Sequence, residues 1–584
     1  MTKMRFVVAF VWSLYAGLTV APLAGQAAGN LPGEVLNWAE VVFHNGKVIT
    51  ADPDFRIAQA VAVRNGKFLA VGDNARILAM AGPNTRVVDL NGRSMVPGFI
   101  DTHLHQAWVT QPRGEQAPAN RPAPPMSSGQ AFRTLEGALE YLRFQVSQAQ
   151  PGEFLALSGP SNKVVIEELN AELLDQVSPN NPLYIEAIND QVVANSLVLA
   201  RIPPDTPGVM KDANGKPTGQ LRGWATGIPV YELSPWPDVE AVLPGQKQEF
   251  ARLNELGLTM VMGRANGLNV SVFRELMLRD ELTIRVRGAH EFLRQNGRPE
   301  AYLKRIGNLT GLGSGMFKII GATVQVVDGA FTMGSAFTDI PKINRVEGDP
   351  YGDYGQNKWT EGTPVEQSDR TNIILGNRYG WTITGMHSSG DRSNTLILEA
   401  FKEANQEKPL LGRHFGLDHG EMLRESHFDM LKDMGVIPSM YTMSITNSQN
   451  YAYQYGPDAV WEMAPAKSLI RAGIKPAAEA DTRPPQSYPL FQIRNWITRK
   501  DRDGKVWNPD ERLTREEALY MYTAWAARYS GEEDILGSIE PGKLADLVIL
   551  GGDYMTFPED NLETLRVHMT MVDGKVVYEV PDAF

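Results

Sequence analysis

The sequence predicts an α/β protein, and three observations support this. Its 584 residues are enough for several domains, or for one barrel with added segments. Short apolar segments typical of buried strands recur along the chain, with helical segments between them. Turn signals between alternating apolar residues occur near both ends and predict a small β-sandwich composed of residues 35–94 and 536–584. We therefore expect a central α/β unit over residues 95–535 with this composite unit beside it.

The composition limits the kinds of partner and site. A formal charge of -12 argues against nucleic acid or an anionic membrane as a partner. An apolar content of 43% is ample for a large core. The chain has no cysteine, so it forms no disulfides and has no thiolate ligands. Any bound metal must be held by histidines and carboxylates.

The N-terminus has the pattern of a secretory signal peptide, which we place at residues 1–28. Lys3 and Arg5 precede an apolar run at 6–20 that is short for a membrane span, and small residues follow at 25–28. We expect cleavage near residues 26–30 and export, to a bacterial periplasm, without stable membrane insertion afterwards. An uncleaved N-terminal anchor is the alternative. No other apolar run is long enough to span a membrane.

The β unit is predicted from hairpin signals. Residues 41–49 and 61–72 each carry an Asn-Gly pair between alternating apolar residues, the strongest short hairpin signal. A similar run, with Asp-Gly, occurs at 571–580. We expect hairpins at these turns.

The stretch MVPGFIDTHLH, at 95–105, is the most informative part of the chain. An apolar strand leads into Asp101, Thr102, His103, Leu104 and His105. Side chains alternate along a strand, so His103 and His105 should face the same side and Leu104 the other. Two such imidazoles suit a transition metal such as zinc. Two histidines on a solvated strand face are the alternative.

PGFIDTHLH resembles the first-strand metal motif of the amidohydrolase superfamily, whose members are metal-dependent (β/α)8 TIM barrels. SIEPGKLADLVIL, at 538–550, resembles the family's closing segment. The resemblance implies a barrel over 95–535 and a composite β-sandwich. Residues 183–200 and 215–223 resemble the branch that contains N-substituted formamide deformylase and related uncharacterised hydrolases. Asp190 replaces a histidine common there, and Arg222-Gly223 replaces an acidic residue, which suggests a different substrate.

The resemblance also implies a ligand set. Beyond His103 and His105, segments at 380–393, 413–423 and 473–485 resemble later barrel strands of the family, with His387, His419 and Asp481 at the ligand positions. The residue before Asp481 is alanine here, where serine is usual. Four further histidines are expected to be structural or exposed: His44, His290, His427 and His568. For His414, both a role in orienting a metal ligand and a surface position stay open.

The expected chemistry is hydrolysis by a metal-activated water. Asp481 would take the proton of that water and pass it to the leaving group. Either a second metal or a protonated His419 would polarise the scissile carbonyl. Relatives bridge two metals with a carboxylated lysine shortly before Asp-Gly, but before Asp328-Gly329 only Lys318 is near, and it is out of register. We expect one tight divalent metal, with zinc favoured over iron or manganese, and a second site that is weak or missing.

The sequence thus predicts an exported amidohydrolase that acts on a carbon–nitrogen bond of a small molecule. An esterase, lactonase or deaminase on the same scaffold is the first alternative, and an inert periplasmic binding protein is the second. Homo-oligomerisation stays open.

Residues 106–135, rich in proline, are expected to form a loop that is either a substrate-facing lid or an ordinary surface loop. Helices are expected at 136–148 and after Thr514, where Thr514 and Glu517 form a capping box and Gly531 lies near the end.

Overall fold

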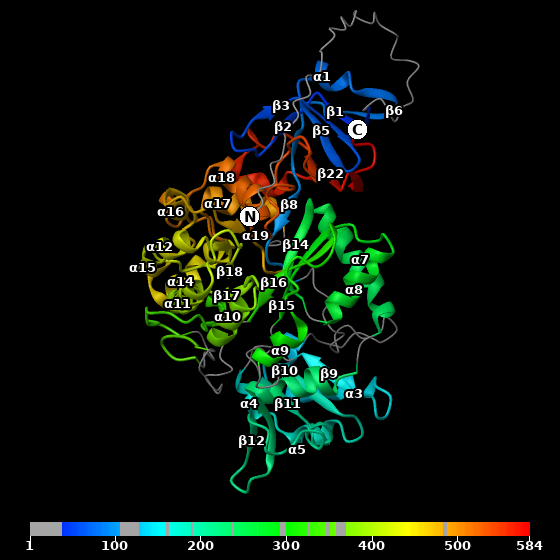
Figure 1. Ribbon diagram of the computed structural model, residues 1–584. Helices are drawn as coiled ribbons and strands as arrows, with labels where there is room; N and C mark the ends of the chain where they lie inside the picture. Colours follow the sequence, from blue (N-terminus) through cyan, green and yellow to red (C-terminus); the bar gives the residue numbers. More distant parts are fainter. Residues whose placement is uncertain are drawn as a thin grey trace, which may run out of the picture.

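The computed structural model (Figure 1) describes residues 38–105, 128–158, 163–187, 191–235, 238–265, 267–291, 299–324, 327–345, 351–357, 369–482 and 488–584. The expected signal peptide and most of the expected loop at 106–135 lie outside these residues. The last part of that loop is helical instead, because α2 covers Ser128–Ala131. Within the described part of the chain, no helix has the length and apolarity needed to cross a membrane.

Both ends of the chain contribute to one six-stranded sheet. Its order is β23-β22-β21-β7-β2-β3, so strands from the first hundred residues pair with strands from the last forty (Figure 1). The strands are β2 (Lys47–Ile49), β3 (Ile57–Ala58), β7 (Ser94–Pro97), β21 (Leu547–Leu550), β22 (Val567–Val572) and β23 (Lys575–Glu579). A four-stranded sheet, β5-β4-β1-β6, shares a hydrophobic core with it. Its strands are β1 (Ala39–His44), β4 (Ala60–Arg64), β5 (Lys67–Gly72) and β6 (Ala81–Asp89).

Two of the three predicted hairpins form. Asn65-Gly66 joins β4 to β5, and Asp573-Gly574 joins β22 to β23, with positive φ at all four turn residues. The hairpin expected at Asn45-Gly46 is wrong. The strands on either side of it, β1 and β2, belong to different sheets, so this turn carries the chain from one layer to the other.

Two parallel four-stranded sheets form the centre of the molecule. Their orders are β16-β15-β14-β8 and β17-β18-β19-β20. The strands are β8 (Phe99–Asp101), β14 (Leu258–Ala265), β15 (Arg285–Glu291), β16 (Phe317–Thr323), β17 (Met386–Ser388), β18 (Gly416–His419), β19 (Ile437–Met440) and β20 (Ala477–Ala478). Single bridges join the sheets at both edges, between Ala322 and Ile383 and between Leu104 and Asp481. The structure therefore shows the expected α/β class, but not one continuous closed barrel.

Alternation along these strands separates an inner core from an outer one. Ile100, Met260, Met262, Ile320 and Ile437 pack together between the two sheets, with residues of the short helix α19 (Ala524–Tyr529). Side chains on the opposite faces pack against the surrounding helices. These helices are α7 (Val239–Glu255), α8 (Gly267–Leu278), α9 (Pro299–Ile306), α10 (Asp369–Arg378), α11 (Asp391–Glu407), α12 (Glu425–Met434), α16 (Ala466–Arg471), α17 (Pro489–Thr498), α18 (Arg515–Met521) and α19 (Ala524–Tyr529). The predicted capping box of Thr514 and Glu517 starts α18, but the helix stops at Met521 and α19 ends before Gly531.

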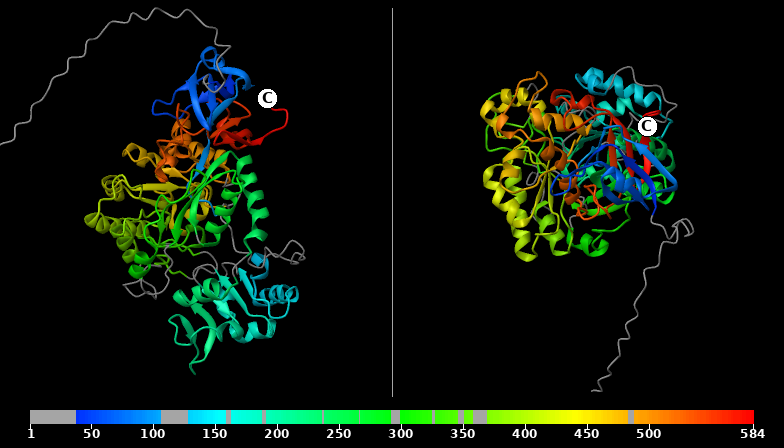
Figure 2. Two further views of the ribbon diagram at one scale, coloured as in Figure 1. Left: turned by 45° about the vertical axis from the view of Figure 1, so that its right-hand side comes forward. Right: turned by 90° about the horizontal axis from the view of Figure 1, so that it is seen from above.

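A further sheet is inserted between β8 and β14, and the sequence analysis did not anticipate it. Its order is β12-β13-β11-β10-β9. The strands are β9 (Leu155–Ser158), β10 (Leu183–Ala187), β11 (Gln191–Ala194), β12 (Val209–Lys211) and β13 (Pro217–Arg222). Helix α3 (Leu135–Ser147), predicted at 136–148, and α5 (Ala171–Val177) pack on it. Figures 1 and 2 place this insertion at the opposite end of the molecule from the terminal sheets.

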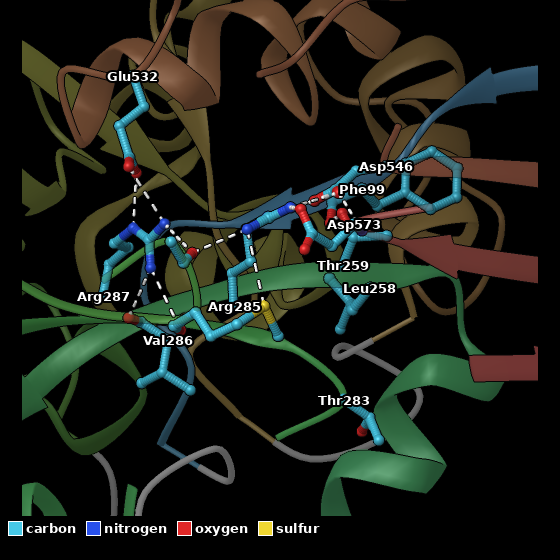
Figure 3. Close-up of polar contacts among 12 residues, drawn as sticks. Phe99, Leu258, Thr259, Thr283, Arg285, Val286, Arg287, Glu532, Asp546 and Asp573 are labelled. Atoms are coloured by element: carbon cyan, nitrogen blue, oxygen red, sulfur yellow. Dashed lines mark hydrogen bonds and ion pairs between the residues drawn. The ribbon is translucent and has the colours of Figure 1, made fainter. Parts of the chain in front are cut away.

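The amino ends of β15 and β16 face the terminal segment through a buried ion network (Figure 3). The guanidinium of Arg285 donates to both carboxylate oxygens of Asp546, at 2.7 and 2.9 Å, and to Asp573 at 3.1 Å. Arg287 donates to both oxygens of Glu532, at 2.6 and 3.1 Å. Lys318 Nζ lies 2.6 Å from the same carboxylate. The carboxyl ends of the parallel strands therefore point away from the terminal sheets, toward the insertion.

Candidate metal centre

The first two candidate ligands follow β8 and face the same point. The Nε2 atoms of His103 and His105 lie 3.3 Å apart, while Leu104 is buried in the outer core. This matches the alternation predicted from the sequence, although the regular strand ends at Asp101. The backbone continues in register because Leu104 bridges to Asp481, with His105 N donating to Asp481 O at 3.1 Å. His103 is buried, whereas the side chain of His105 is 63% exposed.

The other three candidates reach the same place from β17, β18 and the end of β20. The ring of His419 lies 5.2 Å from that of His103 and 4.3 Å from that of His387. Donor atoms of His103, His419 and Asp481 all lie within 4.8 Å of one another. The structure therefore brings together all five residues that the sequence analysis selected.

Three of these donor atoms form a nearly equilateral triangle. His103 Nε2 and His105 Nε2 are 3.3 Å apart, and Asp481 Oδ1 lies 3.4 and 3.2 Å from them respectively. Tetrahedral zinc with bonds of about 2.0–2.1 Å separates its ligand atoms by about 3.3 Å. The triangle thus has the dimensions of one face of such a site. The donor set of imidazoles and one carboxylate suits the same ion.

A buried carboxylate orients His103. Asp418 Oδ2, from β18, lies 2.9 Å from His103 Nδ1, and its other oxygen accepts from the hydroxyl of Tyr529 at 2.6 Å. Burial by itself would lower the pKa of His103, but the facing Asp418 raises it to about 10. Burial likewise favours the neutral form of Asp418, yet His103 lowers the pKa of that carboxyl to about 2. With Nδ1 held by Asp418, Nε2 is left to face the other candidate ligands.

A second buried carboxylate, Glu479, holds His419. Its Oε1 lies 2.5 Å from His419 Nδ1 and accepts the backbone N–H of His419 at 3.0 Å. Its Oε2 accepts from Ser439 Oγ, which lies 2.5 Å from Thr102 Oγ1. A carboxylate oxygen beside Nδ1 favours a proton on that nitrogen, which leaves Nε2 toward the other candidate ligands.

The backbone at two of the ligands is also constrained. His419 and Asp481 have φ of 73° and 62°, in the left-handed region that residues other than glycine seldom adopt. Glu479 accepts the N–H of His419, and Asp101 accepts the N–H groups of His103 and Ala480 at 3.1 and 3.2 Å. These buried carboxylates stabilise a backbone that turns the ligands inward.

His387 has a different neighbour. Its Nε2 lies 3.6 Å from Oδ1 of Asp328. That oxygen accepts from Ser389 N, and Oδ2 of Asp328 accepts from Gly390 N and from the hydroxyl of Ser393. In the sequence, Asp328 only marked the position near which relatives carry a bridging lysine. In the structure it fixes the loop that follows His387. Lys318 lies at the other end of the strands with Glu532, away from the histidines.

Sequence reasoning missed the residues that orient the ligands. Asp418 and Glu479 stand one and two positions before predicted ligands, but only the folded structure shows which histidine each one faces. The histidines outside the set have other contacts. His290 stacks on Trp381, and His427 lies 2.9 Å from Thr395 Oγ1 and caps α12. His414 packs against Gly531.

Comparison with known protein families matches residues 86–578 to the family described as "Amidohydrolase family". The N-substituted formamide deformylase of Arthrobacter pascens is 25% identical over 581 residues, covering 92% of this chain and 98% of the relative. The putative amidohydrolase YtcJ of Bacillus subtilis is also 25% identical, over 92% and 99% of the two chains. Among solved structures, an uncharacterized metal-dependent hydrolase from Pyrococcus horikoshii has a TM-score of 0.63 at 20% identity, over 89% of this chain and 99% of that one, which indicates a shared fold.

Proposed function

Because the chain belongs to the amidohydrolase family, we propose that it is a metal-dependent hydrolase of a carbon–nitrogen bond, other than a peptide bond, in a small molecule. Membership confirms the resemblance drawn from the sequence. The observation that supports the metal is the triangle of His103, His105 and Asp481, with sides of 3.2 to 3.4 Å. We further infer that the two parallel sheets are the halves of a (β/α)8 barrel and that the terminal sheets form its composite sandwich.

The residues around the site define the steps. His103, His105, His387, His419 and Asp481 would hold a divalent ion, with zinc favoured by the imidazoles. Such an ion, when bound, supplies Lewis-acid activation of a water molecule. Asp481 would accept one proton of the attacking water as the water oxygen adds to the carbonyl carbon. Asp481 then returns the proton to the nitrogen, the carbon–nitrogen bond breaks, and an amine and a carboxylic acid leave. His419, with its proton held on Nδ1 by Glu479, keeps Nε2 toward the ion.

The ion pairs of nearby lysines support a proposal for the number of metals. None of the ion pairs formed by the described residues joins a lysine to this cluster, and Lys318 is engaged by Glu532. We propose one tight metal and at most one weak one.

The test is release of amine from N-formyl and N-acyl compounds, beside a panel of esters, lactones and aminopurines, by zinc-loaded and chelator-treated protein. Asp481→Asn should keep most of the metal but lower kcat/KM by about 10²–10⁴-fold, because the amide cannot accept the proton. His103→Ala should lose both metal and activity. His568→Gln, in the terminal sheet, is the matched control. Ester or amine turnover without amide turnover would overturn the proposed bond class.

Export is a separate proposal, supported by Lys3, Arg5 and the apolar run at 6–20. Protein recovered from the periplasm should begin near residues 26–30. An N-terminal sequence that starts at Met1 would contradict this.

A further inference from the structure

An arginine at the carboxyl end of β14 faces the space between the two parallel sheets. Met260 and Met262 belong to the inner core, whereas Val261 and Ala265 pack in the outer one. Arg264 follows Met262 by two positions, so its side chain has the inward direction of the methionines. It lies one step nearer the carboxyl end of the strand, the end at which the candidate ligands gather.

The contacts of Arg264 place it beside those ligands. Its Nε donates to Gly385 O at 3.3 Å, and Thr323 Oγ1 donates to the same carbonyl at 2.8 Å. Gly385 stands two residues before His387, and a Cβ built on it would lie 3.7 Å from Asp418 Oδ2. That oxygen is the one that lies 2.9 Å from His103 Nδ1. The guanidinium therefore lies in the same layer as the residues that orient the site.

The guanidinium is also incompletely paired. No carboxylate of the described residues forms an ion pair with Arg264, and its Nη2 is buried without a hydrogen-bond partner. The other inward-facing arginines differ: Arg285 and Arg287 each have bidentate carboxylate partners. Arg264 is half-buried, and a buried N–H group such as that on Nη2 is costly unless an acceptor arrives. The planar fork of arginine fits the two oxygens of a carboxylate.

We propose that Arg264 binds a carboxylate of the substrate, so that this enzyme acts on amides that carry an acidic group. The inference rests on the proposed function, since the scissile amide must lie at the metal while the carboxylate lies at Arg264. It narrows the substrate class from small amides in general to N-acyl compounds with an anionic oxygen group. The competing explanation is that Arg264 only balances the charge of Asp418.

The probes are three acids of increasing length, N-acetylglycine, N-acetyl-β-alanine and N-acetyl-4-aminobutyrate, each paired with its primary amide. Calorimetry would measure their binding to the zinc-loaded wild type, Arg264→Gln and Arg264→Lys, with metal content recorded for each preparation. The matched control is Arg305→Gln, which removes an exposed arginine from the outer helix α9. Zinc alone attracts carboxylates too, so the comparison between variants, not the affinity itself, is decisive.

At least one acid should bind the wild type about tenfold or more tightly than its amide. Arg264→Gln should abolish this preference, Arg264→Lys should keep part of it, and Arg305→Gln should keep all of it. Equal binding of acids and amides, no binding of any acid, or a preference that survives in Arg264→Gln would each overturn the inference. If Arg264→Gln lowers the metal content but leaves the preference for acids over amides unchanged, Arg264 serves to balance the charge of Asp418 instead.

The two proposals can fail separately. If neutral amides are hydrolysed with zinc but Arg264 shows no preference, the substrate class is wrong and the hydrolase proposal stands. If the acids bind through Arg264 but no amide is hydrolysed with any metal, the carboxylate site stands and the proposed function is wrong.

Discussion

Buried charges lie at both ends of the parallel strands, and the two groups are balanced in different ways. At the amino ends, Arg285, Arg287 and Lys318 meet Asp546, Asp573 and Glu532 in direct ion pairs. At the carboxyl ends, Asp418, Glu479 and Asp481 face imidazoles, which carry charge only when protonated. Several donor atoms there converge on one point. The charges of the first group are balanced by the chain's own arginines and lysine, whereas the imidazoles of the second group can take up either protons or a metal ion.

This difference separates stability from function along a single set of strands. The ion network at the amino ends contributes to stability because it holds the terminal segment against β15 and β16. It needs no ligand from outside the chain. A cluster of carboxylates and titratable imidazoles whose donor atoms converge on one point is arranged to hold a cation, so its presence indicates a binding site. Changes at the two ends should therefore have distinct consequences.

The largest effect expected on stability is at Glu532. Glu532→Gln leaves the buried Arg287 without its carboxylate and should lower the free energy of unfolding by about 3–5 kcal/mol. Urea denaturation of metal-free protein measures it, with metal binding of the folded protein as the control. A loss of metal affinity as large as the loss of stability would show that the two ends are coupled.

Next comes Glu421, which is fully buried near His419 and forms no ion pair among the described residues. Burial raises the pKa of Glu421 from 4.5 to about 7. Between these pH values the folded protein holds a proton that the unfolded chain has released, so its stability falls as pH rises through this window. Glu421→Gln should remove that slope and stabilise metal-free protein at pH 8 by at most about 3 kcal/mol. Equal pH profiles of the wild type and the variant would contradict the assignment.

A smaller effect is expected at Glu479. Glu479→Ala releases the Nδ1–H of His419, and loss of such an orienting carboxylate weakens metal affinity by about 10–100-fold. Chelator competition measures this affinity, and the absorption spectrum of the cobalt-substituted protein reports the ligand geometry. Glu479→Gln, which can still accept from Nδ1, should recover part of both. Unchanged affinity in Glu479→Ala would leave Glu479 with a purely structural role.

The smallest effect is expected at Lys318, whose side chain is 25% exposed. Lys318→Ala should cost about 1 kcal/mol or less, because Glu532 keeps Arg287 as a partner. Elemental analysis should find the same metal content as in the wild type. A metal lost with this lysine would mean that it reaches the site after all.

The five candidate ligands were selected from the sequence because each stands at the end of a strand-like segment. The residues that hold them were not. Asp418 orients His103, and Glu479 orients His419, between strands that are not neighbours in the sheet, and no spacing in the chain relates these partners. They meet because their side chains converge at the carboxyl ends of the two parallel sheets, which is a property of the folded chain.

The fold was predicted unevenly for a similar reason. The turns at Asn65-Gly66 and Asp573-Gly574 encode their hairpins locally, through residues that accept positive φ. Asn45-Gly46 has the same chemistry, but tertiary packing places the strands on either side of it in different sheets. The inserted sheet escaped notice because β9 to β13 are short and their pattern does not reveal where they pack.

The bridge between Leu104 and Asp481 has a consequence for how the molecule is assembled. It joins residues separated by most of the chain, and β7 pairs with β21, which is farther along still. Closing such distant contacts is slow compared with forming local hairpins and helices. During synthesis, His103 is made early but meets Asp481 only after the inserted sheet and both parallel sheets exist. The candidate metal centre is thus among the last parts to be completed. A chain that stops before β21 would keep every proposed ligand yet lack the strand that secures the first of them.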